Sequence, residues 1–579
     1  MKKFLKIGLV LLLLFSMVAC QKTEKKEPKD YTEEFAQYTK DFVAYYYGET
    51  DYGINFDFEH PEDYGIVKGL YAFEGFTKKD YEDYMGFLKE EIDYLKGIDS
   101  AGLNDADQWT YAVILDYLER EYAVKDYFYF EAKGFGSING INSNLPLLLD
   151  EFIFNDKQDV DSYINLLITT PVIIESYLQL ELERRDNGYG LSQIVIDSII
   201  AQCNTILETK NYFLEDSFNK KIDAVDFLTA EEKQTYKQLN KEHLYGEYYG
   251  GYRLLLEELS KIDGTFYNEM PLALVEGGLK YYELLIKRQL GIEKTPKELI
   301  DYLEKEIDEI IGEYMALYYA NGDSLFDEYP YFTSGDSFEE IIDYLYEAIQ
   351  EDFPPLEKSS IEIKTVDASM AENFSPAAYL ITKYDSPVSS REVILINGVY
   401  EDANFTTYAH EGYPGHLYQN VYYKSLDLNM ANYILSNIGY TEGWAVYTEL
   451  YALKYSDLPE TIKRFTYLNS RLNNAVFCLF ELKIHYEGMN KDEFNEYANL
   501  YFAVDQEWSD MIYDLVVEMP SYFLYYNLSY LLIEDAKEQM ATAYGASFTD
   551  YQFHEFVLNH GNGSIGLLLK ELEKELKKK

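Results

Sequence analysis

Two histidines with a glutamate beside the first could bind a metal ion. His410 and His416 are two of only seven histidines in the chain, and Glu411 follows the first of them within the segment from Tyr408 to Gln419. Imidazole nitrogens are common zinc ligands, and a nearby carboxylate can accept a proton from water. These residue types therefore predict a metal site that has its own general base.

The spacing of the two histidines differs from that of the common zinc-protease helix. There the histidines stand four residues apart and lie about 40° apart around a helix, so both reach one ion. Here the separation is six residues, which on an unbroken helix turns the second side chain roughly 120° off the first. Pro414 and Gly415 lie in between, and both residue types permit a break. We predict that the helix is interrupted between Tyr413 and His416, so that the histidines converge.

A carboxylate further along the chain would complete the site. A catalytic zinc takes three protein ligands and keeps one position open for water. We predict His410, His416 and Glu442 as ligands and Glu411 as the general base. Glu449 lies seven residues after Glu442, on nearly the same helical face but about two turns away. This position predicts either a role in supporting the ligands from outside or a contact with substrate. The alternative is that each histidine is an ordinary buried polar residue.

Helices must supply most of the framework around this site. Apolar residues recur at three- and four-residue steps in the stretch 81–95, and the same periodicity covers roughly 105–130, 158–186, 190–217 and 230–260. Two further helix starts are marked by a threonine with a glutamate three residues later, at Thr229 and Thr295. The chain is therefore predicted to be mainly α-helical.

The periodicity changes just before the histidine segment. Residues 360–366 alternate apolar and polar side chains, and short runs rich in branched residues follow at 378–384 and 391–397. These runs predict a small, largely antiparallel β-sheet placed immediately before the metal-binding helix.

No repeat, long linker or low-complexity block divides residues 31–579. We therefore predict one large helical catalytic domain with a cleft, with an organisation into two lobes, at about 31–260 and 261–579, as the alternative.

The first residues resemble a bacterial lipoprotein signal. An apolar block at 7–18 follows a basic start and is too short to span a bilayer in the mature protein. The residues around Cys20 resemble a lipobox, in which this cysteine is lipidated and becomes the new N-terminus. An ordinary cleaved signal is the alternative. We predict a signal peptide at 1–19, a lipidated cysteine with a charged tether at 20–30, and an extracytoplasmic protein anchored to the cell membrane.

The overall charge limits the classes of partner. The chain carries 50 basic and 102 acidic residues, which gives a formal charge of −52. A charge of this sign and size argues against a nucleic-acid partner and against adhesion to anionic lipid. No later stretch is long and apolar enough to be a transmembrane helix, so the lipid on Cys20 is the only attachment to the membrane that we predict.

The histidine segment carries the signature of a known family. The sequence resembles the bacterial family called domain of unknown function 885, whose signature is His-Glu-x-x-Pro-Gly-His followed by a glutamine. Residues 410–419 match it, and further similarity lies at 375–379, 442–449 and 553–558. The family is similar in active-site pattern to the glutamate-ligand zinc peptidases (gluzincins) of thimet-oligopeptidase and Taq-carboxypeptidase type. The resemblance implies a zincin-like helical fold with a deep cleft and one zinc ion per chain.

The resemblance also implies roles for four residues outside the metal site. Tyr526 and His554 match family residues that would act in catalysis by stabilising the developing oxyanion, His554 either directly or by holding Tyr526. Packing roles are the alternative for both. Asn397 and Arg391 match residues that would bind substrate, through a peptide backbone and a carboxylate respectively. The usual Gly-Gln pair before Tyr526 is replaced here by Ser-Tyr, so substrate binding on that side departs from the family pattern.

Together these features predict a zinc-dependent peptidase that hydrolyses short peptides at the outer face of the cytoplasmic membrane. Two alternatives stay open at this stage. One is a non-catalytic surface lipoprotein that binds peptides through a degenerate site, and the other is a metal-dependent hydrolase of a different amide or ester.

Overall fold

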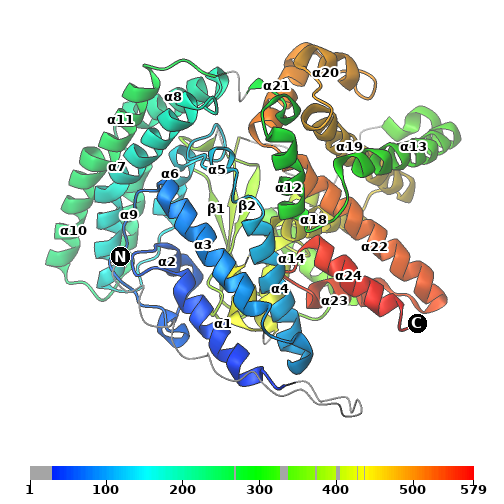
Figure 1. The fold of residues 1–579 in the computed structure, drawn as a ribbon, viewed down its shortest axis with the longest axis horizontal. Coiled ribbons are helices and arrows are strands. Elements are labelled where there is room, and N and C mark those ends of the chain that lie inside the picture. Colours follow the sequence, from blue (N-terminus) through cyan, green and yellow to red (C-terminus); the bar gives the residue numbers. More distant parts are fainter. Residues whose placement is uncertain are drawn as a thin grey trace, which may run out of the picture.

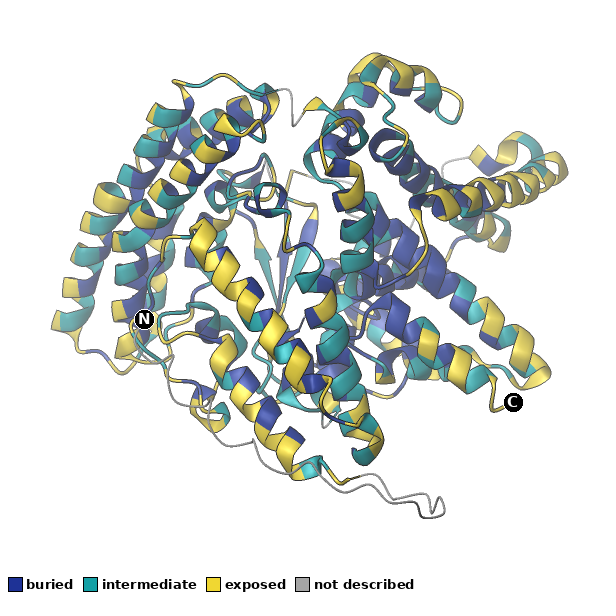
Figure 2. Ribbon diagram, in the orientation of Figure 1, coloured by how far each residue is buried: buried dark blue, intermediate teal, exposed yellow. Residues whose placement is uncertain are grey.

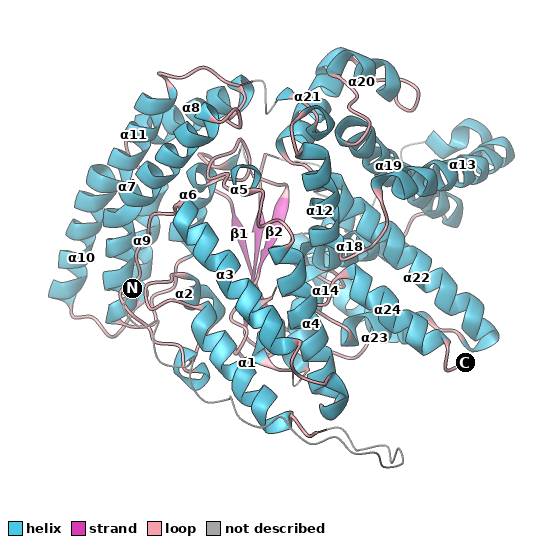
Figure 3. Cartoon of the chain, in the orientation of Figure 1, coloured by secondary structure: helices cyan, strands magenta, loops and turns pink. Residues whose placement is uncertain are grey.

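The structure is a computed structural model of the 579-residue chain. It describes residues 29–265, 269–326, 337–371, 374–399, 405–426, 428–435 and 437–579. The predicted signal peptide, Cys20 and the tether as far as residue 28 lie outside the described residues. Within the described part helices dominate, which confirms a mainly α-helical fold (Figure 3).

The first half of the chain is entirely helical in its described regular elements. Its helices are α1 (Thr32–Tyr46), α2 (Gly53–Asp57), α3 (Lys78–Leu95), α4 (Asp105–Tyr122), α5 (Phe128–Glu131), α6 (Ile141–Glu151), α7 (Lys157–Asp186), α8 (Gln193–Glu208), α9 (Phe213–Ala224), α10 (Ala230–His243) and α11 (Tyr249–Leu259). The predicted helix at 190–217 is two helices, because the backbone becomes extended at Thr209. Capping boxes are present at Thr229 and Thr295, as predicted.

The second half adds a small sheet and further helices. The helices are α12 (Gly278–Leu290), α13 (Pro296–Asn321), α14 (Phe338–Ala348), α15 (Phe405–Glu411), α16 (His416–Ser425), α17 (Met430–Ile434), α18 (Ile438–Tyr451), α19 (Glu460–His485), α20 (Lys491–Ala498), α21 (Gln506–Glu518), α22 (Ser529–Tyr544), α23 (Asp550–Asn559) and α24 (Ile565–Leu576). No helix among the described residues has both the length and the apolar character needed to cross a bilayer.

The sheet is mixed, so the prediction of a largely antiparallel sheet was wrong. Its strands are β1 (Ser360–Thr365), β2 (Ala377–Leu380) and β3 (Arg391–Ile396), in the order β1-β3-β2. β3 pairs parallel with β1 along six residues and antiparallel with β2 along only four. Alternating side chains identify strands but do not reveal that β3 inserts between the other two. In the part of the chain that the structure describes, one edge of β2 therefore has no strand partner.

The described residues pack around two main hydrophobic cores. One runs from Phe35 to Leu259 and the other mainly from Leu272 to Leu572. Figure 1 shows helices α7–α11 on one side of the sheet and α13, α19 and α22 on the other, and Figure 2 shows buried residues gathered between them. Residues of α17 join the first core, so the division into two lobes stays a prediction.

Helix α18 is a largely buried helix of the second core. It packs against α22 and α15, and Trp444 in its middle is fully buried. A side chain at Gly443 would bring its Cβ to 2.5 Å from the Ser529 Cβ and 3.0 Å from the Ser529 carbonyl carbon. Glycine therefore allows α18 and α22 to approach at this point, one residue after Glu442.

We predict that Gly443→Ala destabilises the protein by about 1–3 kcal/mol, because an added methyl group must push apart two packed helices. The measurement is the unfolding temperature, which should fall. Gly312→Ala is the matched control: Gly312 is exposed inside α13, has nothing within 4 Å of an added Cβ, and should gain up to about 1 kcal/mol from better helix propensity. Equal unfolding temperatures for Gly443→Ala and wild type would contradict the packing argument.

Candidate metal centre

The predicted interruption between the two histidines is confirmed. Helix α15 ends at Glu411 and α16 begins at His416, so the break starts at Gly412, two residues earlier than predicted. The chain turns back tightly enough for the Gly415 N–H to donate to the Ala409 carbonyl at 2.9 Å. A Cβ at residue 415 would lie 1.9 Å from the His410 carbonyl oxygen, so this return path requires glycine.

The turn between the helices is held by buried neighbours. Tyr413 is fully buried, and its hydroxyl accepts a hydrogen bond of 3.2 Å from the Ser359 N–H. The Trp444 indole donates to the Pro414 carbonyl at 3.1 Å. Helix α18 therefore fixes the position of the turn as well as carrying Glu442.

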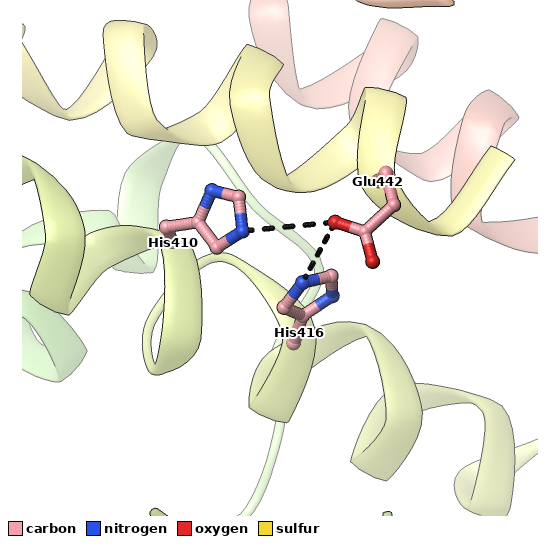
Figure 4. Close-up of side chains that lie close together, drawn as sticks. All are labelled: His410, His416 and Glu442. Atoms are coloured by element: carbon pink, nitrogen blue, oxygen red, sulfur yellow. Dashed lines mark ion pairs between the residues drawn. The ribbon is translucent and has the colours of Figure 1, made fainter. Parts of the chain in front are cut away.

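The break brings both imidazoles to the Glu442 carboxylate. Figure 4 shows the three side chains pointing toward one another from α15, α16 and α18. The Glu442 Oε2 atom lies 3.8 Å from His410 Nε2 and 3.4 Å from His416 Nε2, and one ligand atom from each residue lies within 4.8 Å of the others. Ligand atoms bound tetrahedrally at about 2.1 Å from zinc are about 3.4 Å apart, so the two distances to Glu442 are close to those of a zinc site.

The electrostatics of this group favour a cation. Burial would raise the pKa of Glu442, but the charges of His416 and His410 and a hydrogen bond from Tyr526 lower it below its ordinary value. Glu442 Oε2 is buried and faces the two imidazole nitrogens, but no described residue meets it with a hydrogen bond of good geometry. A buried carboxylate oxygen without a donor is costly unless a cation meets it, which fits a metal ion at this point.

Glu449 contacts the His410 ring nitrogen that does not face Glu442. Its Oε2 lies 3.3 Å from His410 Nδ1, so it can accept the proton on that nitrogen and leave Nε2 facing Glu442. Burial lowers the pKa of His410, but the bond to Glu449 and the charges of three nearby glutamates raise it to about 9. Glu449 therefore orients His410, and in a metal site it would increase the basicity of this imidazole as a ligand.

Glu411 lines the same cavity as the three converging residues. The cavity has a volume of about 340 Å³, and Tyr379 and Tyr526 also line it. Glu411 is buried, and its Oε2 accepts a hydrogen bond of 2.7 Å from the Tyr379 backbone N–H. That N–H lies on the edge of β2 that faces away from β3, so the sheet positions the predicted base.

Tyr526 also enters this cavity, from a π-helical turn at Leu524–Leu528. The turn is anchored by Glu481, which is fully buried and accepts hydrogen bonds from the N–H groups of Ser521 at 2.5 Å and Phe523 at 2.8 Å. Burial raises the pKa of Glu481 to about 8. Ser521, at a family glycine position, adopts a left-handed conformation with φ of 76°, which is strained for serine. The bond to Glu481 helps to hold it there.

Two of the predicted substrate residues lie elsewhere. Asn397 is fully buried, and its amide donates to the Ala371 carbonyl at 2.7 Å, so it holds the loop before β2 and has no surface free for a substrate. Arg391 is exposed at the start of β3 and forms an ion pair with Glu362. Neither lines the cavity of the metal centre, and their assignment as substrate contacts does not fit these positions.

His554 is likewise separated from the cavity. It is fully buried, with Nδ1 2.7 Å from the Asp352 carbonyl and Nε2 2.7 Å from the Tyr447 hydroxyl. Its ring stacks on Phe353 with centroids 3.9 Å apart. Burial lowers the pKa of His554 to about 3, so it is neutral with both nitrogens bonded. Its environment is that of a packing residue, and it contacts Tyr447 rather than Tyr526.

Sequence reasoning missed three contributors to the site, which are the Tyr379 N–H, Glu481 and Tyr522. A signal existed for Glu481, because it is a single acidic residue within the apolar run from Val476 to Leu482, where an unpaired charge needs a specific reason. A backbone N–H leaves no such trace in the sequence. Its role follows only from the way β2 lies beside α15.

Two solved structures share this fold. One is a protein from Colwellia psychrerythraea, provisionally described as a lipoprotein, with a TM-score of 0.78 and 18% identity over 95% of this chain and 100% of that one. The other, from Shewanella oneidensis and provisionally described as a lipoprotein of unknown function, has a TM-score of 0.63 and 14% identity over 93% of this chain and 99% of that one. A search of curated proteins found no match.

Residues 68–572 match the family model for bacterial proteins of unknown function called DUF885. The matched region is most of the chain and contains His410, Glu411, His416 and Glu442. The chain therefore belongs to the DUF885 family of bacterial proteins.

Proposed function

We propose that this protein is a zinc-dependent peptidase that hydrolyses short peptides outside the cytoplasm. The observation that carries the proposal is the convergence of His410, His416 and Glu442, with ligand atoms within 4.8 Å of one another, beside Glu411 in one cavity. This pattern of two histidines, a glutamate ligand and a glutamate base is that of the glutamate-ligand zinc peptidases.

Two imidazoles and one carboxylate form a donor set that suits zinc. His410, His416 and Glu442 would hold the ion, and the Glu442 oxygen that has no hydrogen bond of good geometry would be satisfied by it. When bound, zinc would supply a Lewis acid that polarises a carbonyl group and makes water a better nucleophile.

The protein's own residues supply the proton transfer and the charge stabilisation. The Tyr379 N–H holds one oxygen of Glu411, so the carboxylate is fixed in the cavity and its other oxygen can accept a proton from the attacking water. The Tyr526 hydroxyl lies in the same cavity and could donate a hydrogen bond to the developing oxyanion.

The outer edge of β2 favours a peptide over other amides or esters. Its Tyr379 N–H donates to Glu411 and its Ala377 carbonyl accepts from the Ser375 hydroxyl, so neither group pairs with β3 and this edge faces the metal centre. The Ala377 carbonyl keeps a second lone pair, which can accept a hydrogen bond from the backbone N–H of an extended peptide laid along this edge. The edge would thereby present a peptide bond to the base.

We predict that the full chain binds about one zinc ion and that His416→Ala binds almost none, because only two of the three ligands remain. The measurement is metal content by elemental analysis after gel filtration. His243→Ala is the control, since His243 lies at the end of α10 and contacts Glu247. Similar zinc content in His416→Ala and wild type would exclude the proposed ligand set.

We predict that Glu411→Gln lowers kcat for peptide hydrolysis by about 10²–10⁴-fold, because the base is lost, while zinc content is unchanged. Tyr526→Phe should reduce kcat by a smaller factor through the loss of one oxyanion donor. The measurement is cleavage of a mixture of short peptides by mass spectrometry. Equal rates for Glu411→Gln and wild type would remove Glu411 from the mechanism, and zinc binding without any cleavage would favour a peptide-binding lipoprotein.

The proposed location rests on the N-terminal sequence and on the two solved structures, whose proteins are provisionally described as lipoproteins. We propose that a lipid on Cys20 anchors the protein at the outer face of the membrane. We predict that Cys20→Ser moves the protein from the membrane fraction to the soluble fraction, since one residue carries the anchor. Fractionation followed by immunoblotting measures this, and unchanged membrane association would refute the anchor.

A further inference from the structure

A second and larger cavity, of about 550 Å³, lies beside the candidate metal centre. Its walls come from both halves of the chain. The first half contributes the start of α6 and one face of α8, and the second half contributes the loop before β2 and the three tyrosines Tyr522, Tyr525 and Tyr526. None of these walls was predicted as part of the site, apart from Tyr526.

The two cavities share a boundary. Ser375, Ala378, Tyr522 and Tyr526 line both of them. Ala378 lies next to Tyr379, whose N–H holds Glu411. A ligand that extends from the metal centre past Tyr522 and Tyr526 therefore enters the larger cavity.

The larger cavity contains no ionisable acid or base among its described lining residues except tyrosine hydroxyls. All 22 residues that line this cavity are uncharged, although 26% of the residues in the chain are charged. The neighbouring cavity differs sharply, because Glu411, Glu442 and Glu449 all line it. A charged group that moves into the larger cavity would lose hydration and find no opposite charge there.

The polar groups of this wall are fixed amides and hydroxyls. Asn142 is buried, and its amide donates to Gln202 Oε1 at 2.6 Å. The Gln202 amide in turn donates to the Ser137 carbonyl at 2.7 Å. These bonds hold a neutral polar surface opposite the tyrosine rings. Such a surface can contact an apolar or neutral polar group, but it offers no ion pair.

We infer that the larger cavity is a specificity site that accepts an uncharged segment of the substrate on one side of the cleaved bond. This inference rests on the proposed peptidase function, because it places the substrate in the metal centre. The preferred peptides carry neutral side chains, such as Gln or Leu, where the chain enters this cavity. Peptides with Lys or Glu at that position are rejected by their desolvation cost.

The test uses short peptides that differ at one position only, with Gln, Lys or Glu in turn at each position around the cleaved bond. The zinc-loaded full chain gives kcat/KM, and the Glu411→Gln protein gives Kd without turnover. At one position Gln should exceed both charged residues by at least about tenfold in both measurements. The Lys peptide is the sharper comparison, because the glutamates of the metal centre would otherwise attract it.

The outcomes separate this inference from the proposed function. Cleavage with equal kcat/KM for all three peptides at every position overturns the cavity assignment and leaves the peptidase intact. Discrimination in Kd without any cleavage supports the cavity and refutes the peptidase. Absence of binding by every peptide overturns both.

Two matched variants test whether the selectivity for uncharged side chains arises in the larger cavity. Asn144 is exposed and lines the cavity near the start of α6, whereas Asn204 lies on α8 and is not among the lining residues. Asn144→Asp should raise the ratio of kcat/KM for the Lys peptide over the Gln peptide by about fivefold, as a partly exposed ion pair would. Asn204→Asp should leave this ratio unchanged. The same ratio in both variants would show that the cavity does not select the side chain.

Discussion

The candidate centre depends on one close backbone contact, between Gly415 and the end of α15. The contact lets the chain reverse and start α16 with His416 facing His410, although six residues separate them. A side chain at residue 415 would collide with the His410 carbonyl. Everything chemical about the site follows from this turn, because two imidazoles on one straight helix at this spacing would diverge. The Trp444 bond to the turn then couples it to the helix that carries Glu442.

Several acidic side chains lie close to His410 beside this turn. Three glutamates stand around His410 in a largely buried space. Their mutual repulsion and lost hydration oppose folding of this region unless positive charge balances them, and the raised pKa of His410 lets its imidazolium supply part of that charge. The proposed metal ion would supply the rest when bound. Glu481 is a different case, since its buried carboxylate is matched by backbone N–H groups and serves to position the turn that carries Tyr526.

The sequence predicted the helical class, the break and the converging trio because each depends on local rules of spacing, capping and backbone freedom. Sheet order, by contrast, depends on how distant strands meet, and the parallel pairing of β1 with β3 could not be read from alternation. The residues that we assigned by resemblance to the family show the same limit of local rules. Tyr526 lies in the cavity, whereas Asn397 and His554 are buried with their hydrogen bonds made by neighbouring residues. A motif can fix a residue's place in the chain without fixing which way its side chain faces.

Strand β2 links the chemistry to the proposed selectivity. One edge pairs with β3, the other gives an N–H to Glu411, and Ala378 on the same strand lines both cavities. Because pairing with β3 fixes the path of β2, the base and the entrance to the uncharged cavity are held at a constant separation. The second half of the chain would thus supply the proposed metal ligands, while α6 and α8 of the first half line the cavity proposed to meet the substrate. Changes in α6 and α8 should therefore alter selectivity without disturbing the proposed ligands, since none of His410, Glu411, His416 and Glu442 lies on either helix.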